Sequence, residues 1–383
     1  MSNSLWNEAI QRVLSRMEDT ARSIGERLPH WANTDTGEWV TTADGDWTGG
    51  YYVGMHWLAL KLGPNPALEA RAYRMAEILA LRAGIESVFK SYPIYYGCSV
   101  GAMLAERPRL REIGLACARS LVKMYDPILQ LIPLGKQAEE GSHIGMSESS
   151  IDSMQTAPFL YWAAREANDA NMRDIAFHHA DRIVSIHLRA DNSFIQSTSL
   201  DPKTGRVARQ YTHKGISDTS TWGRAQAWGM LYSTMSYLHD RTQSRWLESA
   251  QRGADWWMTH LPADRVAFWD FDDPAIPNTE RDTAATSIAL AALLRLATVA
   301  PKAKRQAYRA FAEEMAIALV TRHLTPTGAG DRRTPGMLTN ACFNKRADAR
   351  PHDAGTNCEF IVGDYYFFES LLALAGIVDS TKL

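Results

Sequence analysis

Asp152 is the first residue whose type and position suggest chemistry. The run Ser-Ser-Ile-Asp that ends at this residue begins a helix, and the next turns of that helix carry Phe159, Tyr161 and Trp162. An acidic residue that follows a serine cap stabilises the first turn of a helix, which is one role for Asp152. A carboxylic acid packed among aromatic rings holds its proton more tightly, which suits a general acid, and this is the other role.

A second group of candidates lies in the run Ser-Thr-Trp-Gly-Arg-Ala-Gln-Ala-Trp that ends at Trp228. Arg224 and Trp228 are four residues apart and therefore share one helix face. The helix is otherwise nearly uncharged, and a buried arginine needs an anionic partner. That partner is either an aspartate of the protein or a carboxylate of a ligand. Trp222 stands at the opening of the same helix, where a sugar ring would lie.

Two shorter motifs also precede helices. Asp46 and Trp47 open a helix, either as a cap and a core residue or as the floor for a sugar ring. His213 and Lys214 lie in a loop before the Trp222 helix, where such residues are commonly solvated. A binding role for these two side chains is the alternative.

The elements that must position these residues are almost all helical. Hydrophobic periodicity predicts twelve helices, in which members with one charged face alternate with members that carry few charges. Their ranges are 5–27, 48–62, 67–84, 94–105, 108–132, 150–167, 170–188, 220–240, 243–260, 282–298, 303–323 and 363–378. Six hairpins of one exposed and one buried helix fit an all-α fold, the (α/α)6 barrel, as a single domain over residues 1–383. The candidate residues fall at the openings of the buried helices, which converge on one central cavity.

Two segments interrupt this pattern. Residues 193–198 and 207–212 flank a Pro- and Gly-containing turn and predict a small β-hairpin insertion. The long loop 325–360 is rich in Gly, Pro, Arg and Asp, and is predicted to be a lid or a contact surface.

Composition excludes several classes of protein. The 41 basic and 43 acidic residues give a net charge of −2, which argues against nucleic-acid binding. The longest apolar run, Ile288–Leu294, is too short for a membrane helix. The four cysteines form no CxxC pair and the start has no secretory pattern, so a cytoplasmic protein without disulfides is expected. No metal-ligand spacing, phosphate loop or dinucleotide motif is present, so neither a metal nor a cofactor is expected.

The motifs together resemble a known family. In order, they are Asp-Trp-Thr-Gly-Gly-Tyr-Tyr from Asp46, Ile151-Asp152, Thr-His-Lys-Gly from Thr212, the run around Arg224, Phe-Trp-Asp-Phe from Phe268, Arg-Asp-Thr-Ala-Ala from Arg281 and Gly-Asp-Tyr-Tyr-Phe-Phe-Glu from Gly363. The chain resembles the unsaturated glucuronyl hydrolases, glycoside hydrolase family 88, with the unsaturated rhamnogalacturonyl hydrolases as a related family. The resemblance covers about residues 46 to 370, and the run around Arg224 is its most specific part.

The resemblance implies an (α/α)6 barrel and a metal-free reaction on oligosaccharides produced by polysaccharide lyases. Their non-reducing end is a 4,5-unsaturated uronic acid. An aspartate protonates C4 of the alkene, and water deprotonated by the same group adds at C5. Carried over by motif, Asp152 is this acid and base. Trp47 then stacks on the unsaturated ring, and Arg224, Trp228 and the His213–Lys214 loop line the pocket, with Asp46 and Trp222 as further substrate-binding candidates.

This chain departs from the family pattern at several positions. The family usually carries a second Asp before the fourth helix, and the matching position here is near Tyr95, which is predicted to donate a hydrogen bond to Asp152. The family's hairpin His is replaced near Ile195–Gln196, its usual Gln is replaced by Lys214, and an aromatic expected shortly after Gln130 is absent. The sequence therefore predicts a divergent member. Another sugar-active (α/α)6 enzyme (a conventional glycosidase, a lyase or an epimerase) and a sugar-binding homologue that lost catalysis are the alternatives.

Overall fold

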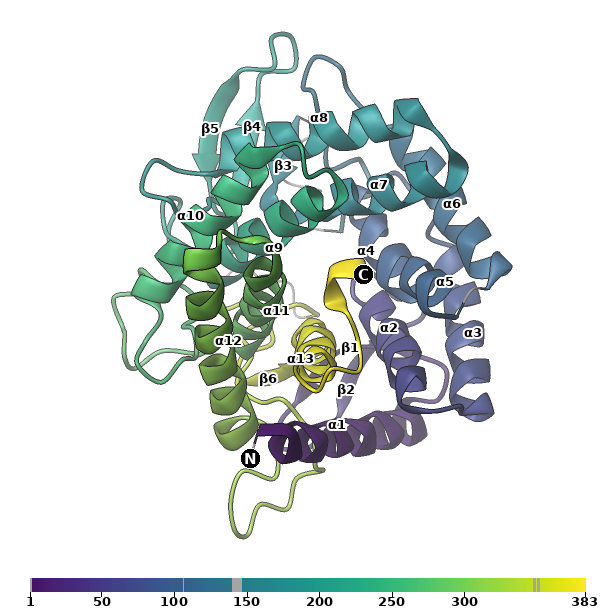
Figure 1. Cartoon of the computed structure of the whole chain (residues 1–383), viewed down its shortest axis with the longest axis vertical. Helices are drawn as coiled ribbons and strands as arrows, with labels where there is room; N and C mark the ends of the chain where they lie inside the picture. The colour runs from purple at the N-terminus through teal and green to yellow at the C-terminus, as the bar shows by residue number, and fades with distance from the viewer. Residues whose placement is uncertain (1, 106, 140–146, 347–348, 350–351) are drawn as a thin grey trace.

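The computed structural model contains two concentric rings of helices (Figure 1). It describes residues 2–105, 107–139, 147–346, 349 and 352–383. The outer ring consists of α1 (Ser2–Ile24), α3 (Pro66–Ala80), α6 (Pro108–Val122), α8 (Ala170–His187), α10 (Ser244–His260) and α12 (Lys302–Arg322). The inner ring consists of α2 (Gly49–Ala59), α4 (Ser91–Ile94) continued by α5 (Val100–Ala105), α7 (Thr156–Ala167), α9 (Gly223–His239), α11 (Thr283–Val299) and α13 (Ile361–Leu374). The predicted (α/α)6 architecture is confirmed.

The two rings differ in composition because they differ in environment. Every residue of α11 from Thr283 to Leu296 is buried, and α9 is buried from Gly223 to Ser236. The outer helix α12 instead buries one stripe and exposes lysines, arginines and glutamates on the other side. A helix that is apolar all round requires neighbours on every side, and the amphipathic outer helices supply them.

A three-stranded sheet joins the two ends of the chain. The strands β2 (Trp39–Thr42), β1 (Leu28–Asn33) and β6 (Cys358–Phe360) pair antiparallel in that order. The sequence analysis did not predict this sheet. Its strands are three to six residues long and show no regular alternation of buried and exposed positions.

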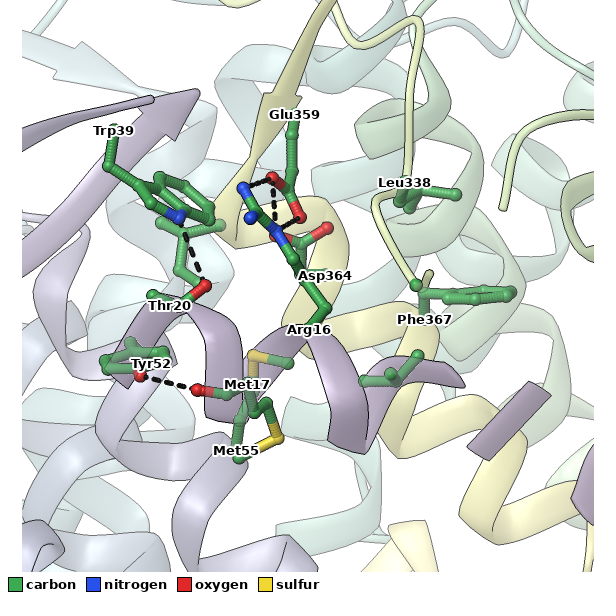
Figure 2. Close-up of a pocket in the computed structure, with 13 residues that line it drawn as sticks. Arg16, Met17, Thr20, Trp39, Tyr52, Met55, Leu338, Glu359, Asp364 and Phe367 are labelled. Atoms are coloured by element: carbon green, nitrogen blue, oxygen red, sulfur yellow. Dashed lines mark hydrogen bonds and ion pairs between the residues drawn. The ribbon is translucent and has the colours of Figure 1, made fainter. Parts of the chain in front are cut away.

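A buried ion pair reinforces the same closure (Figure 2). Arg16 of α1 donates from Nε to both carboxylate oxygens of Glu359, each at 3.0 Å. Asp364 of α13 lies beside this pair and lines the same pocket. Burial raises the pKa of Asp364 well above its ordinary value, and the Glu359 carboxylate adds to the rise.

A second small sheet contains the predicted hairpin. The strands β4 (Ser197–Leu200) and β5 (Val207–Tyr211) pair antiparallel, as expected, and β3 (Glu148–Ser150) adds a third strand on β4. The predicted helix 150–167 therefore begins later: β3 is followed by a 3-10 turn, Ile151–Gln155, and only then by α7. Asp152 lies in this turn.

The predicted helix 108–132 was too long, since α6 ends at Val122. The Asp126 carboxylate accepts the backbone N–H groups of Ile128 at 2.8 Å and Leu129 at 3.1 Å, which forms a local turn in place of helical bonds. Gln130 follows with a positive φ of 59°. Among the described residues, no helix combines the length and the apolar character that crossing a bilayer would require.

Candidate active site

Most of the candidate residues meet in one pocket at the openings of the inner helices. The lining residues are Trp47, Phe89, Tyr92, Asp152, Lys214, Trp222, Arg224 and Trp228. Six of the nine residues expected from the sequence are therefore together, although they come from four separate regions of the chain.

Asp152 is half-buried in the pocket wall and its main chain is held on two sides. The hydroxyl of Tyr92 donates to the backbone carbonyl of Asp152 at 2.6 Å. The N–H of Ile151 donates to the carbonyl of Gln196 at 2.8 Å, which ties the turn to the segment entering β4. The hydroxyl of Ser150 donates to the Asp152 carboxylate itself. The backbone of this turn and the Ser150 hydroxyl thus help to orient the carboxylate.

Aromatic rings form the apolar part of the pocket. The ring centroids of Trp47 and Tyr92 are 5.8 Å apart, and those of Tyr92 and Trp228 are 5.9 Å apart. Gly50 explains the close approach of α2 to α4, since a Cβ at this position would lie 2.3 Å from Cα of Pro93. The pocket thus has flat apolar faces of the kind that suit a sugar ring.

Asp46 does not line the pocket but holds Trp47 in place. It has a positive φ of 46°, and its carboxylate accepts the backbone N–H of Trp47 at 2.6 Å. Asp46 is therefore a turn residue that presents Trp47 to the pocket.

Arg224 finds its anionic partner inside the protein. Its Nη1 donates to Oδ2 of Asp282 at 2.6 Å, and both side chains are at most 1% exposed. The guanidinium also donates to the backbone carbonyls of Cys342 and Phe343. Asp282 caps α11 through Oδ1, which accepts the N–H of Ala284 at 3.1 Å. The sequence left two partners possible for Arg224, an aspartate of the protein or a carboxylate of a ligand. The structure shows the aspartate, Asp282.

Lys214 brings a cation to the pocket wall. Its Nζ lies 4.9 Å from the ring centroid of Phe343, 5.6 Å from that of Trp222 and 5.7 Å from that of Trp47. Rings at such distances stabilise an ammonium group through their negative faces. The Lys214 backbone N–H donates to Oε1 of Gln196 at 3.0 Å, so Gln196 helps to order the loop.

His213 and Tyr95 are not among the residues that line this pocket. The His213 ring is hydrogen-bonded to Ser197 of β4, with Nδ1 and Oγ 2.7 Å apart. Tyr95 begins a π-helical turn, Tyr95–Ser99, and its ring packs against Tyr96 and Phe159 at centroid distances of 5.1 and 5.8 Å. The predicted hydrogen bond from Tyr95 to Asp152 is wrong, because the buried Tyr95 hydroxyl has no hydrogen-bond partner among the described residues. The hydroxyl of Tyr92 donates to Asp152 instead, at its backbone carbonyl.

Comparison with known proteins places this architecture among sugar-active enzymes. An unsaturated glucuronyl hydrolase of Bacillus sp. (strain GL1) is 27% identical over 97% of this chain and 97% of its own length. An unsaturated chondroitin disaccharide hydrolase of Streptococcus pyogenes serotype M1 is 25% identical, covering 95% of this chain and 90% of its own. This chain is a divergent relative of the unsaturated glucuronyl hydrolases. No family model matches the sequence.

Solved structures share the fold of this glucuronyl hydrolase relative. The crystal structure of the unsaturated glucuronyl hydrolase from Bacillus sp. GL1 has a TM-score of 0.88 and 24% identity, with 96% of each chain covered. An unsaturated glucuronyl hydrolase from Streptococcus agalactiae has a TM-score of 0.89 and 20% identity, covering 100% of this chain and 94% of its own. The ring of paired helices is therefore common to them.

The sequence analysis missed Phe89, Tyr92 and Phe343. Tyr92 lies at the opening of the α4 region, in the stretch compared with the family's second Asp, and Phe89 lies two residues before that stretch, so the position of Tyr92 carried a signal. Phe343 belongs to the loop 325–360, more than a hundred residues from the other contacts of Lys214, and no motif marks it. The loop predicted as a lid or contact surface supplies this ring, while its residues 347, 348, 350 and 351 lie outside the described part.

Proposed function

We propose that this protein is a hydrolase that acts on oligosaccharides with a 4,5-unsaturated uronic acid at the non-reducing end. The observation that carries the proposal is the joint placement of one half-buried carboxylate, Asp152, one cation, Lys214, and flat aromatic walls in a single pocket. The relatives support it, because the Bacillus and Streptococcus proteins are named as hydrolases of unsaturated glucuronyl and chondroitin disaccharide substrates. A Streptococcus agalactiae relative of the same fold has been solved in complex with dGlcA-GalNAc6S.

Asp152 is the acid and the base of the proposed reaction. Its carboxyl group gives a proton to C4 of the alkene, which leaves positive charge at C5 beside the ring oxygen. The Asp152 carboxylate then takes a proton from a water molecule, and the water oxygen bonds to C5. The product is a hemiketal that opens and releases the rest of the sugar, and Asp152 is again protonated.

The other lining residues bind and orient the substrate in this proposal. Trp47 and Trp228 offer faces for the unsaturated ring, and Lys214 pairs with its carboxylate. Arg224 contributes indirectly, since its bonds to Asp282 and to the carbonyls of Cys342 and Phe343 fix the wall behind Trp222. His213 orders the loop that presents Lys214.

The number of carboxylate side chains that line the pocket favours hydration over conventional glycoside hydrolysis. Asp152 is the single carboxylate among the described residues that line it. Conventional glycosidases use two carboxyl groups, about 5 to 9.5 Å apart, across the scissile bond. Protonation of an alkene and activation of water in sequence require only one group.

The test is loss of the alkene absorbance of the unsaturated uronate. The full chain would be incubated with lyase products of glycosaminoglycans, gellan, xanthan, ulvan and pectin. We expect a decrease with at least one of them, and Asp152→Asn to lower kcat by about 10² to 10⁴-fold. His178→Ala, an exposed residue of α8, is the control and should keep full activity. No decrease with any product would overturn the proposed reaction and favour the binding-protein alternative.

We also propose a cytoplasmic location, where oligosaccharides arrive after lyase cleavage. The four cysteines are buried free thiols, which a reducing compartment maintains. Cell fractionation with an antibody against the chain would test this.

A further inference from the structure

A cluster of metal-ligand side chains lies beside the sugar pocket and is not used by the proposed reaction. His30 of β1, His352 and Asp353 each offer one ligand atom, and these atoms all lie within 4.8 Å of one another. His30 and Asp353 are 323 residues apart in the sequence, so no local spacing could reveal the group. Pairing of β1 with β6 brings the two segments together.

The surroundings of His30 define its orientation. The side chain is fully buried, and Nδ1 lies 2.6 Å from Oγ1 of Thr48. When Nδ1–H donates to this oxygen, the lone pair of Nε2 points at the Asp353 carboxylate. A second-sphere hydrogen bond from the opposite ring nitrogen is the usual way in which a metal-ligating histidine is held.

The distance between His30 Nε2 and Asp353 Oδ1 also fits a shared ion. It is 3.4 Å, longer than the roughly 2.7–2.9 Å of a charge-assisted hydrogen bond. Two ligands of a tetrahedral zinc ion, each at about 2.0–2.1 Å, stand about 3.3–3.4 Å apart. His352 is exposed and stacks on His30 at a centroid distance of 4.7 Å, so its ring must turn to bring a nitrogen to the same ion.

We propose that His30, His352 and Asp353 form a binding site for a late first-row divalent cation such as Zn²⁺. Two imidazoles and one carboxylate suit such an ion and leave a fourth position for water. The His30 ring contacts Phe343 at a centroid distance of 4.9 Å and Trp47 at 6.3 Å, directly behind the pocket wall. The bound ion ties the segment before β6 to β1 and thereby holds this wall, without taking part in the hydration step.

The test measures binding without any substrate, so its result is independent of the proposed activity. Untagged full-length protein, freed of metal with a chelator, would be titrated with Zn²⁺ by calorimetry and with Co²⁺ by visible absorption. We expect one ion per chain and tetrahedral cobalt bands. His352→Ala and Asp353→Asn should each weaken binding at least about tenfold, while His178→Ala should not change it.

A matched pair at Thr48 tests the orienting hydrogen bond. Thr48→Ser keeps the hydroxyl and should retain the affinity, whereas Thr48→Val removes it and should weaken binding by about ten- to a hundredfold. Affinity in His352→Ala and Asp353→Asn equal to that of the unmodified chain would overturn the site. Absence of stoichiometric binding would do the same and would leave His30 and Asp353 as a hydrogen-bonded pair.

Discussion

Lys214 carries the charge that most directly suits a uronate. It stands among the rings of Trp47, Trp222 and Phe343 on the pocket wall, while the nearby Arg224 is bonded to Asp282 and to backbone carbonyls. With a net charge of only −2, the protein has no overall positive charge to attract an anionic sugar, so local groups such as Lys214 must recognise it.

Lys214→Met should therefore weaken substrate binding more than chemistry. Loss of a charged hydrogen-bond partner costs about 1.5–3 kcal/mol, so KM should rise about ten- to a hundredfold with a smaller change in kcat. Steady-state alkene loss measures both constants. Lys345→Met is the control, because Lys345 is ion-paired with Glu280 and does not line the pocket. An equal rise of KM in both variants would contradict the assignment.

Tyr92 is a positioning residue in the proposed mechanism. Tyr92→Phe keeps the ring and removes the hydrogen bond to the Asp152 carbonyl. A neutral hydrogen bond of about 0.5–1.5 kcal/mol corresponds to a roughly two- to tenfold fall in kcat, with KM nearly constant. The matched control is Tyr95→Phe, one turn further along and outside the pocket. If the two variants behaved alike, the Tyr92 contact would not matter for catalysis.

The site residues show what sequence can and cannot provide. Asp152, Trp47 and Trp228 stand at helix openings, and the convergence of these openings in a ring was enough to place them together. The exchange of Tyr95 for Tyr92 was not predictable, because both tyrosines lie at the opening of the same inner-helix region and the sequence does not show which of them faces Asp152. The pairing of Arg224 with Asp282 depends on the neighbouring inner helix, and the sequence left it undecided.

At the scale of elements, the Arg224–Asp282 pair connects three parts of the ring. Arg224 belongs to α9, Asp282 caps α11, and the guanidinium also binds the carbonyls of Cys342 and Phe343 in the following loop. Burial raises the pKa of Asp282, and the nearby Arg224 charge opposes this rise. One buried pair thus fixes the packing of both helices and the loop that carries Phe343.

Asp282→Asn isolates the charge of this pair, because asparagine keeps an oxygen that can cap α11. A buried arginine left without its anion costs about 3–5 kcal/mol, so the free energy of unfolding should fall by this amount. Denaturant unfolding at neutral pH measures it. Asp264→Asn removes the partner of Arg281 in a more exposed pair, and should cost about 1 kcal/mol or less. Equal decreases in the free energy of unfolding of the two variants would show that the buried pair stabilises the fold no more than the exposed pair does.

Helices and strands differed in how well the sequence predicted them. The alternation of charged and uncharged helices predicted all six hairpins. A helix that is buried on all sides carries few charged residues, whereas a helix buried on one side carries them on its exposed face. The strands β1, β2 and β6 depend on partners far along the chain, and their side-chain patterns are too short to show a period. The pairing of these short strands therefore could not be predicted from the sequence.

At the scale of the whole molecule, the ring is closed where its two ends meet. The α1 residue Arg16, the β6 residue Glu359 and the α13 residue Asp364 form one buried cluster (Figure 2). Burial raises the pKa of Glu359, and the Arg16 guanidinium opposes the rise. Among the described residues that line this pocket, one cation, Arg16, thus stands beside two buried carboxyl groups. We propose that residues 1–383 form one domain, whose cooperativity depends on this closure.

The pH dependence of stability should report this closure. The folded-state pKa of Asp364 is raised above its unfolded value, so the stability that its proton provides is fully present below the unfolded pKa. This stability is lost progressively as pH rises toward the folded-state pKa, because the buried group must either ionise or stay protonated at increasing cost. Asp364→Asn mimics the neutral acid and should remove this decline. The free energy of unfolding of the variant, relative to the unmodified chain, should therefore increase from about pH 4 upward.

Urea unfolding across a pH series measures the difference, with Asp35→Asn in an exposed turn as the control. A constant difference across the series would mean that Asp364 is not the group that links ring closure to pH.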